Sequence, residues 1–270
     1  MSLPAAGLSR ARYGSQTLHA EWTKLRTLAG TGWLLLAVAV LTIAVSAAAD
    51  ASATCQSRRC QADPAKLSLT GVQAGQAIVA IVAVLAVSGE YSTGMIQVTL
   101  TAMPRRLTVL AAKSALIAGL VLAAGAVAVP ASVLAGRLIL PGHGFTPAHG
   151  YPPLSLGDGP VLRAACGSVL YLALIALLSL GVATAVRESA VAIGLVLGLL
   201  YVFPVVASVV SNQHWQRHLE QIGPVAGLYV QDTVDVQALP LTPWQGLAVL
   251  ALWAAGALTV GALVLRLRDA

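Results

Sequence analysis

Charged residues are scarce in this chain. Asp, Glu, Lys and Arg make up 10% of its 270 residues, whereas 57% are hydrophobic. A soluble domain normally carries about 25% charged residues, so the composition excludes a protein whose surface mostly faces water. The few charges also avoid six stretches of at least 23 residues each, which contain none: 27–49, 67–89, 114–136, 164–186, 189–216 and 236–265.

These uncharged stretches predict membrane-spanning helices. A helix rises by about 1.5 Å per residue, so each stretch can cross a hydrocarbon core of about 30 Å. Long apolar runs satisfy their backbone hydrogen bonds as helices, whereas the strands of a membrane barrel are shorter and alternate in polarity. We therefore predict an all-α, polytopic membrane protein, with residues 1–270 forming a single transmembrane domain. The six predicted spans cover about 32–49, 68–89, 111–135, 163–186, 189–210 and 242–265.

The basic residues predict the orientation of the spans. With six spans both termini lie on one side, and ten of the 16 Lys and Arg residues fall on that side. The positive-inside rule places this side, and both termini, in the cytoplasm. Once the acidic residues are included, the whole formal charge of +6 is cytoplasmic. This charge fits contact with anionic lipid headgroups and gives no reason to expect nucleic acid as a partner.

Cysteine is also rare, with three residues in the chain. Cys55 and Cys60 fall in the first predicted outer loop, where an oxidising compartment allows a disulfide that closes a small loop. The alternative is two free thiols. Cys166, near the outer end of the fourth span, has the character of a small apolar residue.

Signatures of catalysis are missing from the sequence. There is no G-x-x-x-x-G-K-[ST] phosphate loop, because none of the three lysines follows a glycine, and there is no H-E-x-x-H zinc motif. His214 and His218 are four residues apart with Glu220 nearby, but a third convincing metal ligand is missing, which favours a polar helix face. We therefore predict no enzyme activity, metal or cofactor in this chain.

The predicted spans also lack the ionisable residue that ion-coupled transporters keep at depth, where a charge is costly and is kept for function. Their polar content is Ser, Thr, Gln and small residues, which serve helix packing. This pattern disfavours a proton-driven pump. It favours a channel, a scaffold or a transporter that is powered by another protein.

The segment before the first span predicts an amphipathic helix over 16–31. Apolar residues recur at helical spacing while charged residues lie between them, which is typical of a helix in the headgroup plane. The alternative is a simple anchor at the point of membrane entry. The residues of this interfacial helix are Leu18, Glu21, Trp22, Lys24, Leu25 and Arg26.

The richest predicted cytoplasmic segment is GEYSTGMIQVTLTAMPRR, from Gly89 to Arg106. It leaves the second span, turns at a glycine, continues as a short and nearly uncharged helix, and stops at Pro-Arg-Arg. Such a helix needs lipid headgroups or a docking protein to cover it; the alternative is an ordinary basic loop. Its candidate coupling residues are Glu90, Tyr91, Gly94, Met95, Val98, Pro104, Arg105 and Arg106.

The third predicted outer loop has internal order. Residues 212–222 have a helical pattern, Gly223-Pro224 break it, and 225–230 are apolar again. An apolar piece behind a helix breaker, next to a span, predicts a re-entrant or interfacial hairpin, because irregular backbone at membrane depth must be buried in protein or line a cavity. Within the spans, Pro130 and Pro204 predict kinks.

Two segments of the chain resemble six-span permeases of the ABC-2 type. The first is EWTKLRT, from Glu21 to Thr27, running into the first span. The second is the exit of the second span through GEYSTGMI and PRR, where Met95 stands in place of the threonine that the family pattern has after the glycine. The number and spacing of the spans extend the resemblance over nearly the full length.

The resemblance implies the membrane subunit of an ATP-driven exporter in the cytoplasmic membrane of a bacterium. The amphipathic helix would be its interfacial connecting helix, and residues 90–103 would be the coupling helix that docks on a separate cytoplasmic ATPase subunit. Residues 212–232 would be the outer re-entrant element. ATP and Mg would bind the partner ATPase, and a second permease copy, identical or paralogous, would complete a dimer. The alternative from another class is a non-transporting anchor or scaffold subunit of a multi-protein complex.

Overall fold

The structure is a computed structural model that describes residues 29–55, 62–92, 106–234 and 236–268. Every regular element in these ranges is helical, and six helices are long and apolar enough to cross a membrane. This confirms the predicted all-α, polytopic fold class. Of the interfacial helix expected over 16–31, residues 16–28 lie outside the described residues, and 29–31 belong to the first helix of the described chain. The spanning segments are Leu35–Ser52, Pro64–Gly89, Leu107–His143, Gly159–Val186, Ser189–Val209 and Pro243–Leu267.

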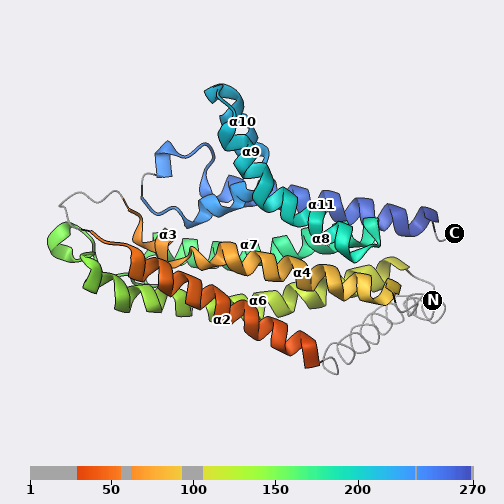
Figure 1. The fold of residues 1–270 in the computed structure, drawn as a ribbon, viewed down its shortest axis with the longest axis horizontal. Helices are drawn as coiled ribbons and strands as arrows, with labels where there is room; N and C mark the ends of the chain where they lie inside the picture. The colour runs from red at the N-terminus through yellow and green to blue at the C-terminus, as the bar shows by residue number, and fades with distance from the viewer. Residues whose placement is uncertain (1–28, 56–61, 93–105, 235, 269–270) are drawn as a thin grey trace, which may run out of the picture.

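The first four spans form a bundle of long helices (Figure 1). They come from α2 (Ala29–Ser52), the short α3 (Pro64–Ser68) followed by α4 (Gly71–Ser92), then α6 (Arg106–Ile139) and α7 (Gly159–Val186). Because neighbouring helices run in opposite directions, α2 begins, α4 ends and α6 begins at the end of the bundle where the C-terminal helix finishes. We call this the terminal end, and the opposite end, where α3 lies, the loop end.

The spanning helices extend beyond the uncharged stretches and take in ionisable residues near their ends. Asp50 belongs to α2, Lys113 and Arg137 to α6, and Arg163 to α7. The expectation that the spans hold no ionisable residue is therefore wrong at the span ends. A charge-free run marks the minimum apolar length. A helix can continue past it where a polar side chain finds a partner or reaches the membrane surface.

The loop between the third and fourth spans is shorter than the predicted spans, which end at 135 and resume at 163, imply. Helix α6 runs through Pro130 without a break and continues to Ile139, and two single 3₁₀ turns follow, η1 (Leu140–His143) and η2 (Pro147–His149). The irregular backbone of this loop is therefore confined to residues 144–146 and 150–158.

The fifth span is divided into three parts. Helix α8 (Ser189–Leu197) passes into a π-helical turn, η3 (Gly198–Val202), and then into α9 (Phe203–Val209), with Pro204 in its first turn. Proline removes a backbone donor and clashes with the preceding turn, and π-helical turns occur where a helix absorbs such a defect. Helix α8 packs on α4 and α7, whereas α9 contacts chiefly η3 and α10 (Gln213–Ile222).

Helices α9 and α10 project away from the bundle, across the direction of the spans (Figure 1). The chain then returns through the 3₁₀ helix η4 (Pro224–Gln231) and η5 (Val236–Ala238) to the last span, α11 (Pro243–Arg268). The helix expected over 212–222 and the break at Gly223-Pro224 are confirmed.

Helix α7 is the centre of the structure and contacts α4, α6, α8, α11 and η4. Its fully buried side chains are mainly apolar, and they pack against neighbours rich in alanine, glycine and valine, as expected where lipid gives helices no hydrophobic reason to associate. These core residues are Tyr171, Leu172, Ile175, Leu178 and Leu180.

Candidate functional site

The predicted coupling segment connects α4 to α6 at the terminal end. Glu90 and Tyr91 belong to the last turn of α4, and Arg106 is the first residue of α6. The other five coupling residues, Gly94, Met95, Val98, Pro104 and Arg105, lie outside the described residues, so their docking role stays a prediction. The residues of the interfacial helix, from Leu18 to Arg26, also lie outside the described part.

A buried lysine joins the two helices next to this segment. The Lys113 ammonium of α6 donates a hydrogen bond of 3.1 Å to the carbonyl oxygen of Ala86 on α4. Lys113 is only 7% exposed, and a charged donor in such a place forms a strong hydrogen bond. Both residues lie about two turns from the helix ends that the segment connects. A force on the segment would therefore reach α4 and α6 together.

The chain between α2 and α3, which is the predicted first outer loop, is attached to η1 at the loop end of α6. Cys55 is buried and disulfide-bonded, and its backbone amide donates to the carbonyl of His143 at 2.9 Å. Gly144 has a φ of 94°, and a side chain there would collide with the Cys55 carbonyl. Cys60, the partner expected from the sequence, lies outside the described residues, and Cys166 is free.

A polar network at the loop end was not predicted from the sequence. Asp63 caps α3 by accepting hydrogen bonds from the backbone amides of Ala65 and Lys66, at 3.0 and 3.2 Å. The same carboxylate accepts from the amide and hydroxyl of Thr233 and from the amide of Val234. One side chain thus connects two segments about 170 residues apart in sequence. The Asp63-Pro64 pair is a helix-start signal, but its distant partner has no local signature.

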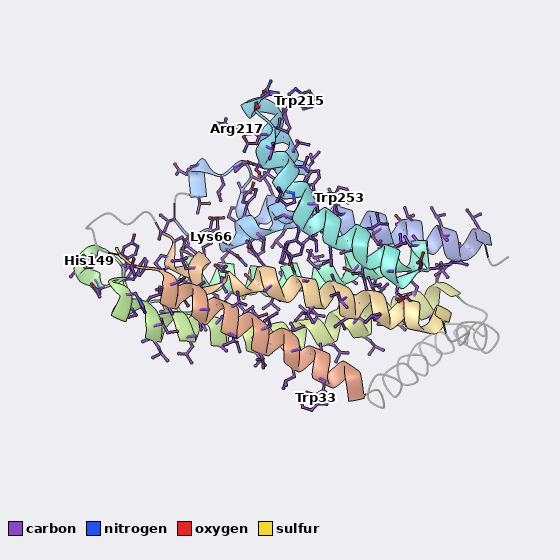
Figure 2. All side chains as sticks on the ribbon, in the orientation of Figure 1. Trp33, Lys66, His149, Trp215, Arg217 and Trp253 are labelled. Carbon is purple, nitrogen blue, oxygen red and sulfur yellow. The ribbon has the colours of Figure 1, made fainter. Side chains whose placement is uncertain are left out.

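An ion pair extends this network. The Lys66 ammonium lies 2.7 Å from a carboxylate oxygen of Asp232, and the Arg163 guanidinium at the start of α7 donates to the backbone carbonyl of Asp232. The Lys66 side chain is 49% exposed and that of Asp232 is 11% exposed. The side chain of Lys66, labelled in Figure 2, reaches from α3 to Asp232 at the end of η4. The network therefore holds three elements at the loop end in one arrangement.

The apolar hairpin expected after Gly223 is a 3₁₀ helix buried against the bundle. η4 packs on α7 and α11, and the side-chain amide of Gln231 at its end donates to the Ser168 hydroxyl on α7 at 3.0 Å. Gly246 on α11 permits the contact, because a Cβ there would collide with the carbonyl oxygen of Ala226. Burial, with the Glu220 and Asp232 carboxylates, raises the pKa of Tyr229 to about 12.

Two further polar contacts lie inside the bundle. The Tyr171 hydroxyl donates to the Gln76 side-chain carbonyl, and both residues are almost fully buried. The Ser68 hydroxyl donates to Asp50 at 3.1 Å. Because the groups in each pair come from different helices, these bonds fix how α4 sits on α7 and how α3 sits on α2.

The fifth span has its own polar contact to α4. The Tyr201 hydroxyl in the π-helical turn donates to the carbonyl of Gln73. Helix α4 is therefore bonded to α6 through Lys113, to α7 through Gln76 and to the fifth span through Gln73. Any displacement of α4 along its axis would change all three contacts.

Side chains that could bind a metal do not gather in the described ranges. His214 and His218 bring their Nε2 atoms to 3.4 Å on the exposed side of α10, and no group of three His, Cys, Asp or Glu side chains in this part of the chain could hold a metal ion. The arrangement offers hydrogen bonds between helices and a large apolar surface.

The chain was also compared with known proteins. No protein-family model matches the sequence, and no curated protein is significantly similar to it.

Proposed function

We propose that this chain is the permease subunit of an ATP-binding-cassette exporter in a bacterial cytoplasmic membrane. The observation that carries the proposal is the segment between α4 and α6. Its sequence, GEYSTGMI followed by PRR, resembles the coupling helix of ABC-2 permeases, and the two helices that it connects are joined by a buried charged hydrogen bond close to their ends. A separate ATPase subunit would bind ATP and Mg, and a second permease copy would complete the transporter.

Polar contacts along α4 support a mechanism for coupling. Closure of the ATPase pair on ATP would push residues 90–103 and displace α4 and α6 together. Helix α4 would transmit this movement to α7 through Gln76 and to the fifth span through Gln73. The short α3 before it would transmit the movement to the end of η4 through Lys66. Transport requires two global states with different contacts, and these bonds are the ones that would differ.

The test is a mild-detergent pull-down of the tagged chain from its native membrane, with mass spectrometry and an ATPase assay on the eluate. We expect a stoichiometric soluble subunit with a phosphate loop. Glu90→Ala and Gly94→Pro should each abolish its co-elution and the ATPase activity while the level of the chain in the membrane stays unchanged.

Glu188→Ala is the matched control. Glu188 is an acidic residue that precedes α8 in the turn between α7 and α8, at the same end of the bundle, and makes no capping hydrogen bond with its side chain. It should retain the ATPase subunit. Retention of the subunit and of full activity by Glu90→Ala and Gly94→Pro would refute the coupling role. If no nucleotide-binding protein elutes even after gentle cross-linking, the chain is instead a scaffold subunit.

A further inference from the structure

Helix α10 is strongly amphipathic. Asn212 caps it by accepting from the amides of His214 and Trp215. Residues 215, 219 and 222 are spaced so that Trp215, Leu219 and Ile222 share one face. The opposite face carries Gln216, Arg217, Glu220 and Gln221, with His214 and His218 on the border.

The apolar face of α10 is not covered by the bundle. Trp215 is 62% exposed and Ile222 is 57% exposed. The preceding helix α9 has the same character, since Val205, Val206 and Val209 are between 57% and 76% exposed. Exposed apolar area that continues from one helix to the next requires an apolar surrounding.

Only the C-terminal end of α10 is bonded to the last span and the chain just before it, among the contacts described. The indole of Trp253 on α11 donates to the carbonyl of Ile222 at 2.8 Å, and the Gln221 side chain donates to the carbonyl of Pro240 at 3.1 Å. The N-terminal part, with Trp215, stands away from the bundle (Figure 2). Helix α10 is therefore an arm that is held at one end.

The orientation of α10 relative to the spans indicates what surrounds each of its faces. Because α10 runs across the spans, one of its faces is directed along them toward the terminal end and the other toward the loop end. Figure 2 shows Trp215 on the side toward the terminal end and Arg217 on the opposite side. A bilayer around the six spans places hydrocarbon on the first side and headgroups and water on the second. Tryptophan is enriched at this interface, and arginine binds phosphate.

We propose that α10 is a lipid anchor that lies in the headgroup layer of the membrane leaflet at the loop end. Trp215 and Ile222 insert among the acyl chains, and Arg217 contacts lipid phosphate groups. The valines of α9 continue the hydrocarbon-facing surface toward the membrane interior. The anchor does not depend on the proposed exporter function, because any protein with these six spans would present α10 to the same leaflet.

The experiment is spin labelling of the full chain in vesicles of phosphatidylcholine and phosphatidylglycerol in equal amounts. Ile222→Cys and Arg217→Cys are each introduced into a Cys166→Ala background and spin-labelled. The collision rate of the spin label is then measured with two probes: oxygen, which enters hydrocarbon, and a polar nickel chelate, which does not. The unsubstituted background, tested for uptake of label, shows whether Cys55 and Cys60 stay unreactive. Val209→Cys on α9, 76% exposed, is the matched hydrocarbon reference.

We expect the oxygen-to-nickel ratio at position 222 to be several-fold higher than at 217 and close to that at 209. Trp215→Ala should lower the ratio at 222, and Trp215→Phe should preserve it. Equal nickel access at 217 and 222 would overturn the proposal, since it would place both faces in water. Spin–spin broadening at 222 that disappears on dilution with unlabelled protein would also overturn it, since a second copy would then cover the face. An unchanged ratio at 222 in Trp215→Ala would refute the role of Trp215.

Discussion

The Asp63 carboxylate accepts more hydrogen bonds than any other side chain of the loop-end network. It accepts from the amides of Ala65 and Lys66 at the start of α3, and from the amide and hydroxyl of Thr233 and the amide of Val234. Replacement by alanine removes the helix cap and the connection to residues 233–234 in one step. We predict that Asp63→Ala loosens both segments, because their amides lose a charged acceptor that no neighbouring group replaces at the same position.

The magnitude follows from the types of bond that are lost. Loss of a helix cap costs about 1 kcal/mol, and a hydrogen bond to a charged group contributes about 1.5–3 kcal/mol. Because Asp63 is only partly buried, water compensates for some of this loss, and a local destabilisation of about 2 kcal/mol is the reasonable figure. Since about 1.4 kcal/mol corresponds to a factor of ten, exchange of the affected amides should accelerate on the order of 30-fold.

Hydrogen–deuterium exchange of the purified chain, followed by mass spectrometry of peptides covering 62–70 and 229–236, measures this effect. Asp158→Ala is the control, because Asp158 precedes α7 at the equivalent cap position but makes no capping hydrogen bond with its side chain. It should leave exchange in both peptides unchanged. Equal acceleration in the two variants, or protection at 229–236 that survives Asp63→Ala, would show that the long-range connection contributes nothing to stability.

Two other predictions concern buried contacts. Gly246→Val should lower the melting temperature of the detergent-solubilised chain, because the new side chain would collide with the Ala226 carbonyl and displace η4. Gly256→Val, on the same helix with open space beside it, is the control and should leave the melting temperature nearly unchanged. Similar melting temperatures of the two variants would refute the close approach of α11 and η4. Tyr171→Phe should cost about 1–3 kcal/mol by leaving the Gln76 carbonyl buried without its donor, and addition of Gln76→Leu should restore part of that loss. Additive losses in a double-mutant cycle would show that the two side chains do not interact.

The fold class could be predicted from the sequence because one physical effect outweighs all others in hydrocarbon. An unpaired backbone amide in hydrocarbon costs several kcal/mol, so uncharged runs of this length form spanning helices, which pair all their amides internally. Local chemistry also predicted the helix of residues 213–222 and the break at Gly223-Pro224, since proline and glycine act on their immediate neighbours.

The ends of the spans could not be predicted in the same way. Lys113 was expected at the cytoplasmic end of the third span with no partner identified, and the structure buries it within α6, where the carbonyl of Ala86, 27 residues earlier in the chain, accepts its hydrogen bond. A charged side chain is excluded from a membrane-spanning helix only when it lacks a partner. The partner of Lys113 belongs to another helix, so the sequence of α6 alone does not reveal it. The loop-end network was missed for the same reason, because neither Asp63 nor Thr233 identifies the other in the sequence.

The sequence alone therefore determined that this is an all-α membrane protein with six spans, because hydrophobic length and backbone satisfaction are properties of each segment by itself. The tertiary structure alone decided which polar groups meet, that η4 is buried between α7 and α11, and that α10 presents Trp215 away from the bundle. These features depend on distances between residues remote in the chain and on space left free by glycines such as Gly246. A one-dimensional pattern carries neither kind of information.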